Sequence, residues 1–185
     1  MTDRLFTFVG GQQGPWQVAA VRTIAGDPLP AVSRLSVVAG EPPAVAAGWR
    51  LRGITSNERY VTRHEKNALA AIQQPLGRYD ATCAAFIPIR KSAEWWALTQ
   101  DERRTIFEAT SRHIQIGMEY LPAVARRLHH CRDLGAAEPF DFLTWFEFAP
   151  DETRAFDDLV GRLRETDEWR FVEREVDIRL VRDAV

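Results

Sequence analysis

Residues 125–148 read ARRLHHCRDLGAAEPFDFLTWFEF, and this stretch decides which fold class the chain adopts. Its two ends are short runs, ARRLHHC at residues 125–131 and the largely aromatic FLTWFEF at residues 142–148. Turn-forming residues separate them, and this arrangement predicts two β-strands. The part of the molecule around this stretch is therefore expected to contain a sheet.

Alternation along these two strands predicts which side chains share a face, because successive side chains of a strand point to opposite sides. If the face of the first strand that carries Arg126 and the face of the second strand that carries Thr144 line one cavity, that cavity is apolar and holds one cation, Arg126. A guanidinium stays charged at any working pH and can hold a small anion. The alternative is that Arg126 pairs with a nearby carboxylate. The first strand places Arg126, Leu128 and His130 on one face, and the second places Phe142, Thr144, Phe146 and Phe148 on one face.

Outward from this stretch, strands alternate with helices along the chain. A helix is expected over Arg63–Gln73, ending before Pro75. Such a mixture predicts an α+β fold with a largely antiparallel sheet, and a ferredoxin-like repeat is compatible with it. The other strands are expected over Leu5–Val9, Trp16–Ile24, Leu35–Val38, Trp49–Ile54, Ala84–Ile89 and Val172–Leu180.

Two further helices have recognisable starts. Thr99 and Glu102 fit a capping box. After this capping box, the spacing of apolar residues by three or four positions predicts one helix with one apolar face. Asp151 is expected to cap a second helix. The first helix would present Ile106, Ala109, His113 and Gly117 on one face, and the second Phe156, Leu159, Val160 and Leu163.

His113 is the histidine with the most informative position. It is either a core histidine that donates to a carbonyl, or an axial haem ligand, with Gly117 leaving room for a flat macrocycle. His129 and His130 are adjacent on a strand, so their rings point to opposite faces. A zinc site is not expected, and no HExxH motif is present.

Glu168 and the pair Trp95-Trp96 each allow two interpretations. Glu168 follows the last helix and is either a solvated loop residue or the hydrogen-bond partner of an iron-bound histidine. The two tryptophans come soon after Lys91. They form either an aromatic core beside a lysine stem or a haem wall beside a propionate partner.

Composition limits the classes of partner. The 185 residues are 45% hydrophobic and carry a net charge of −2, so neither nucleic acid nor an anionic membrane is an expected partner. No apolar run approaches the length of a membrane span, and residues 1–8 do not resemble a signal peptide, so a cytoplasmic location is expected. Cys83 and Cys131 are expected to be free thiols.

Several separated motifs together resemble the chlorite dismutase family, and more closely its short-chain, dimeric branch. The resemblance runs from about Trp49 to Leu180, with the motifs in order and at compatible spacing. They are Ile87–Lys91, Trp95-Trp96, Ser111–His113, Ala125–Asp133 and Phe140–Glu147.

This resemblance implies a single domain over residues 1–185, folded as a dimeric barrel of two ferredoxin-like halves. Residues 1–90 would form an abbreviated N-terminal half, and residues 91–185 would form the half that binds haem b. His113 would be the proximal ligand of the iron, and Glu168 its hydrogen-bond partner. Lys91, Trp95 and Trp96 would line the proximal side and the propionates. Arg126 would be the distal arginine, in a pocket with Leu128, Thr144 and Phe146.

The implied activity is the conversion of chlorite to chloride and dioxygen, with Arg126 retaining the oxidised chlorine fragment. A distal arginine favours this chemistry over that of the related coproheme decarboxylases. A haem-binding sensor or carrier without turnover, and a cofactor-free ferredoxin-like protein, are also compatible with these residues. Trp145 alternates away from Thr144 and Phe146, so it is expected to point outward and form a contact in a homodimer.

Overall fold

The computed structural model describes residues 4–42, 46–55, 59–135 and 137–183. Within them, antiparallel strands form one closed barrel in the order β1-β3-β2-β8-β5-β7-β6-β4. Their bounds agree with the predicted strands to within a few residues. The strands are β1 (Leu5–Gly11), β2 (Trp16–Ala25), β3 (Arg34–Ala39), β4 (Trp49–Ile54), β5 (Cys83–Lys91), β6 (Ala125–His130), β7 (Phe142–Phe148) and β8 (Val172–Arg182).

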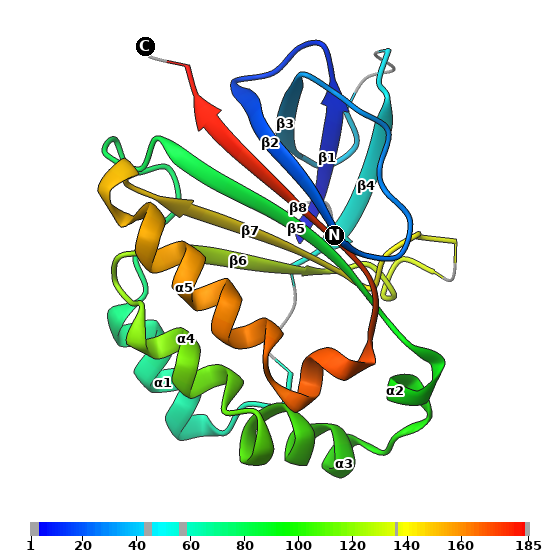
Figure 1. The fold of residues 1–185 in the computed structure, drawn as a ribbon, viewed down its shortest axis with the longest axis vertical. Coiled ribbons are helices and arrows are strands. Elements are labelled where there is room, and N and C mark those ends of the chain that lie inside the picture. The colour runs from blue at the N-terminus through cyan, green and yellow to red at the C-terminus, as the bar shows by residue number, and fades with distance from the viewer. Residues whose placement is uncertain (1–3, 43–45, 56–58, 136, 184–185) are drawn as a thin grey trace.

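The helices gather on one side of the barrel, beside the sheet formed by β5 to β8 (Figure 1). The predicted α+β class is therefore confirmed. No helix in the described part of the chain is long and apolar enough to cross a membrane. The α-helices are α1 (Arg63–Ile72), α2 (Ala93–Ala97), α3 (Gln100–Arg104), α4 (His113–Glu119) and α5 (Thr153–Arg164).

The four N-terminal strands and the four C-terminal strands have the same spatial order. The first four stand β4-β1-β3-β2 and the last four stand β8-β5-β7-β6, so each set follows the pattern fourth, first, third, second. Helices connect β5 to β6 and β7 to β8, as in a β-α-β-β-α-β unit. In the described residues no helix lies between β1 and β4.

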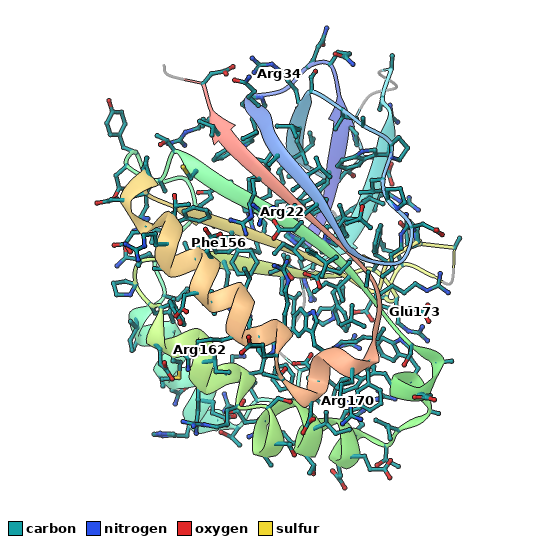
Figure 2. The ribbon with its side chains drawn as sticks, viewed as in Figure 1. Arg22, Arg34, Phe156, Arg162, Arg170 and Glu173 are labelled. Atoms are coloured by element: carbon teal, nitrogen blue, oxygen red, sulfur yellow. The ribbon has the colours of Figure 1, made fainter. Side chains whose placement is uncertain are left out.

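Apolar side chains are buried on both sides of the C-terminal strands. One cluster fills the barrel interior and joins residues from opposite walls, such as Phe8, Phe86 and Ile178. A second cluster lies between the outer face of the sheet and the helices, and contains Phe146 and Phe156. Figure 2 shows side chains on the sheet and on the helices that face it. The middle of these strands is therefore covered on both faces, while strand ends such as Val181 of β8 stay exposed.

Trp145 belongs to the barrel interior, so its expected role as a subunit contact is wrong. Its side chain is 2% exposed and packs against Trp16 with ring centroids 5.2 Å apart. Its indole nitrogen donates to Glu147 Oε1 at 2.8 Å. Alternation correctly separates Trp145 from Thr144 and Phe146. It does not reveal that the opposite face of the strand is closed off by the rest of the barrel.

The segment from Thr99 to Gly117 is not the single helix that its spacing predicts. The capping box of Thr99 and Glu102 is confirmed and begins α3. A π-helical turn follows over Thr105–Thr110, and Arg112 then adopts a left-handed conformation with φ 53°. A new helix, α4, begins at His113. The break is stable because a side chain caps the new helix: Ile114 N–H donates to Glu108 Oε2 at 2.7 Å.

The start of α5 also differs from the prediction. Asp151 lies inside a 3-10 turn, Pro150–Glu152, and makes no side-chain cap. Proline fits the first position of such a turn because its missing N–H needs no partner there. The predicted apolar face of this helix is confirmed, since Phe156, Leu159, Val160 and Leu163 are all buried.

We expect Trp145→Ala to lower the free energy of unfolding by about 3–5 kcal/mol, because it leaves a large cavity in the barrel. Subunit association should be unchanged. Urea denaturation and sedimentation velocity measure the two effects. Tyr79→Ala is the control, because Tyr79 is 94% exposed. Weakened association with unchanged stability would contradict the interior position.

Candidate functional site

A pocket lies between the outer face of the C-terminal sheet and the helices. Its lining combines side chains from the sheet, including Ile87 and Phe146, with side chains from α4 and α5, including Ile114 and Leu159. Both His113 and Arg126 line it, the first from α4 and the second from β6. The pocket is therefore largely apolar, with polar groups at both walls.

The strand face predicted around Arg126 is present in the structure. β6 and β7 pair so that Arg126 lies opposite Phe146 and Leu128 lies opposite Thr144. These four residues line the pocket, together with His130 and Phe142. The hydrogen-bonded register of two strands thus brings them together.

Arg126 is not the single cation of the pocket, and the sequence-based prediction of a lone cation is wrong. Arg59, Lys91 and Arg164 also line it. Each of these three has a carboxylate partner: Asp133, Glu168 and Glu175 lie 2.6, 2.8 and 2.6 Å away, respectively. Sequence alternation could not place them, because they come from a loop, a strand end and a helix.

His113 is the first residue of α4 and is fixed on several sides. Its Nδ1 lies 2.6 Å from Glu168 Oε2. The ring stacks on Phe107 with centroids 4.3 Å apart, and Trp169 lies nearly parallel at 6.3 Å. With Nδ1 bonded to Glu168, the Nε2 atom is left for a ligand of the pocket.

Glu168 lies in a 3-10 helix, Asp167–Phe171, and is 4% exposed. Both carboxylate oxygens have partners, since Oε1 accepts from Lys91 Nζ at 2.8 Å. Its backbone N–H donates to Ser111 Oγ at 2.9 Å. Burial acts to raise the pKa of Glu168, but the charges and hydrogen bonds of His113 and Lys91 lower it to about 2. The carboxylate is therefore ionised at neutral pH.

Lys91 is held by groups that stabilise its charge. It ends β5 and is 4% exposed. Its Nζ lies 4.7 Å from the Trp95 ring centroid and 5.3 Å from that of Trp169. The ion pair with Glu168 and the two indole faces together replace the water that burial removes.

The two adjacent tryptophans have different positions. Trp95 is 1% exposed and lines the pocket, and its Nε1 has no hydrogen-bond partner in the described part of the chain. Trp96 is not part of the lining. Its Nε1 donates to Asp141 Oδ2 at 3.1 Å, and the same oxygen accepts the Lys91 backbone N–H at 2.7 Å. Trp96 thus lies behind the lining, where it stacks on the pocket residue Phe142 with ring centroids 6.0 Å apart.

Several residues of the site were not predicted. Phe107, Ser111 and Trp169 contact His113 or Glu168, as described above. Arg164 also donates to Asp177 at 2.9 Å, and Trp169 Nε1 donates to Glu175 Oε2 at 2.7 Å. The alternation of the last strand marks Glu175 and Asp177 as a polar face. It gives no sign that α5 covers this face and buries both carboxylates.

The sequence of this chain is similar to those of chlorite dismutases. A family model for chlorite dismutase matches residues 43–183. The chlorite dismutase of Ideonella dechloratans is 30% identical over 123 residues, which is 65% of this chain and 40% of that protein. This chain therefore spans less than half the length of that relative.

Solved structures give the same family. A dimeric chlorite dismutase from Nitrobacter winogradskyi is 54% identical with a TM-score of 0.89, over 96% of this chain and 99% of that one. The chlorite dismutase of Candidatus Nitrospira defluvii is 28% identical with a TM-score of 0.59, over 72% of this chain and 55% of that one. The similarity to the first extends over nearly the whole of both chains.

We expect Lys91→Met to lower the free energy of unfolding by about 3–5 kcal/mol, because it removes a partner from a buried charge. The double variant with Glu168→Gln should recover part of this loss, since no buried charge remains. Arg90→Met is a matched control: it breaks an exposed ion pair with Glu173 and should cost about 1 kcal/mol or less. Equal losses for Lys91→Met and Arg90→Met in urea denaturation would contradict the role given to Lys91.

Proposed function

This chain belongs to the chlorite dismutase family, and from that premise we propose that it binds haem b through His113 and converts chlorite to chloride and dioxygen beside Arg126. The observation that carries the proposal is the pocket itself. It holds a histidine with one nitrogen already bonded to a carboxylate on the helical wall, and an arginine on the sheet wall.

Three features of the pocket fit haem. A Cβ added at Gly117 would meet nothing within 4 Å, so there is open space beside the helix that carries His113. The indole nitrogen of Trp95 is a buried donor whose partner is missing from the described residues, and it suits the carboxylate of a propionate. The remaining lining is mostly apolar and suits a flat macrocycle.

The residues behind His113 prepare it as an iron ligand. Glu168 accepts a hydrogen bond from Nδ1–H of His113, which fixes the tautomer and makes Nε2 more basic. Lys91 keeps the carboxylate charged and in place. Bound haem iron supplies the redox chemistry, and the protein supplies orientation and electrostatics.

On the sheet wall, Arg126 provides the charge that acts on chlorite. A cation in a poorly hydrated pocket attracts a small anion more strongly than it does in water. Bound haem would supply the redox chemistry that breaks the Cl–O bonds, and the charge of Arg126 would hold the hypochlorite-level fragment in the pocket. Leu128, Thr144 and Phe146 surround Arg126 and limit the escape of this fragment. Both oxygen atoms of chlorite then leave as dioxygen, and chlorine leaves as chloride.

The fold and assembly are part of the same proposal. The equal strand order of β1–β4 and β5–β8 supports two ferredoxin-like halves, the first abbreviated by the lack of helices between its described strands. The similarity to a dimeric relative at 54% identity supports a homodimer.

The decisive experiment is an oxygen-electrode trace after chlorite is added to haem-loaded protein. Stoichiometric release of dioxygen at catalytic haem levels supports the proposal. If no dioxygen is released, a haem sensor or carrier is the interpretation that stays.

One observation favours a second candidate function: Tyr60 lines the pocket, and coproheme decarboxylation begins at a tyrosine. Formation of haem b from coproheme and peroxide would identify that activity.

We expect His113→Ala to lose stable haem binding while the protein stays folded, because the pocket then lacks its iron ligand. Titration with haem, followed by the Soret band, measures the loss. His64→Ala on the exposed side of α1 should bind haem like the parent. An unchanged Soret spectrum and full haem stoichiometry in His113→Ala would show that another residue binds the iron.

We expect Arg126→Ala to release roughly tenfold less dioxygen per enzyme before inactivation, because the charge that retains the fragment is lost. A hypochlorite scavenger should partly restore this yield. Arg126→Lys should be intermediate, because lysine keeps the charge without the planar fork. Arg59→Ala is a matched control, since Arg59 lines the same pocket from a loop and pairs with Asp133. If Arg126→Ala gives the same yield as the parent with and without scavenger, Arg126 does not retain the fragment.

A further inference from the structure

We propose that β2 forms the homodimer interface, by pairing with β2 of a second copy of this chain along an edge that the barrel leaves open. This inference rests on the homodimer proposed above and names its contact surface. With Trp145 buried inside the barrel, that contact needs a different surface.

The first observation is the hydrogen bonding of β2. On one side, β2 pairs with β8 from Trp16 to Ala25. On the other side, it pairs with β3 only at Trp16 and Gln17, and Val18 N–H donates to Ser33 O. Among the described residues, no backbone group other than those of β8 bonds residues 19–25. The barrel therefore closes at the beginning of β2 and leaves the rest of this edge open.

The second observation is the exposure of β2 on both faces. All residues from Ala19 to Ile24 are exposed. In β7, by contrast, every residue except Phe142 is buried. The exposed side chains include Val21 at 46% and Ile24 at 39%, and Val181 on the neighbouring β8 is 42% exposed. Nothing in the described chain covers residues 19–24 of this strand.

The third observation is the lack of charge. From Leu5 to Gly26 the only charged residue is Arg22, although 27% of the whole chain is charged. Natural proteins usually protect an open edge with charges or proline, because such an edge pairs readily with another strand. Within β2 itself, no lysine, proline or acidic residue gives this protection. A sparsely charged patch is also typical of the centre of a homodimer interface.

A second copy of the chain fits this edge better than another partner. A two-fold axis brings the same surface patch of both subunits together, and an antiparallel strand pair has this symmetry. A relative that is 54% identical over 96% of this chain is dimeric. β2 contributes no residue to the pocket lining, so its contact can change without altering the pocket.

The test is sedimentation equilibrium of the haem-loaded protein with charges placed on the edge. The double variant Val21→Asp, Ile24→Asp should raise the dimer dissociation constant by about 100-fold or more, since like charges meet across the axis. Its haem loading should match the parent. Ile72→Asp is the matched control, because Ile72 is 41% exposed on α1 and outside the edge. It should remain dimeric.

The outcomes separate the interface from the wider proposal. A double variant that binds haem and dimerises like the parent would overturn the assignment of β2. A monomeric parent would overturn the homodimer as well, while leaving chlorite turnover to be judged by its own assay. Loss of dimer in Ile72→Asp together with the double variant would also count against β2.

Hydrogen exchange of the unaltered protein gives an answer that does not depend on a variant folding. Within residues 19–25, the amides that β8 does not bond should exchange slowly in concentrated protein and faster after dilution below the dissociation constant. The amides of β1, which has paired strands on both sides, should exchange equally at both concentrations. Fast exchange of the β2 edge at both concentrations would overturn the proposal.

Discussion

The buried carboxylate of Glu168 is the group on which the architecture of the site depends. A charge removed from water costs several kcal/mol unless partners replace the lost hydration. Here the partners come from two distant segments, Lys91 at the end of β5 and His113 at the start of α4. The 3-10 helix that carries Glu168 is anchored by Ser111 as well. Satisfying one carboxylate thus brings three segments together and orients the histidine before any cofactor binds.

The C-terminal sheet separates this site from the structural core. One face of its strands lies inside the barrel, and the other forms the wall of the pocket. Adjacent arginines on β6 show the consequence. Arg126 lines the pocket, whereas Arg127 lies 4.4 Å from the Phe6 ring centroid, and burial lowers the pKa of its guanidinium. The same residue type therefore lines the pocket on one face of the strand and packs against an aromatic ring on the other.

The sequence predicts those parts of the site that depend on local periodicity. Two strands with period two are sufficient to group Arg126 with Leu128 and Thr144 with Phe146, whereas the register of the two strands shows that these faces meet. The break before His113 could not be predicted, because the π-helical turn preserves apolar spacings of three and four residues across it. Alternation likewise gives two faces for Trp145 without revealing what covers each. The partners of Glu168 and Glu175 come from distant segments, and the spacing of neighbouring residues carries no information on them.

The absence of helices between the described strands β1 to β4 links the fold to the proposed assembly. In the C-terminal four strands, α4 and α5 cover the outer face of the sheet and create the pocket. The N-terminal four strands have the same spatial order without such cover. A sheet must bury its apolar surface against another layer, and its open edges must be protected. The interior of the barrel buries side chains of β1, β3 and β4, such as Phe8, Leu35 and Leu51, but residues 19–24 of β2 stay exposed and carry a single charge. In the proposed dimer, a second copy of the chain would protect the edge of β2 that the N-terminal strands leave open.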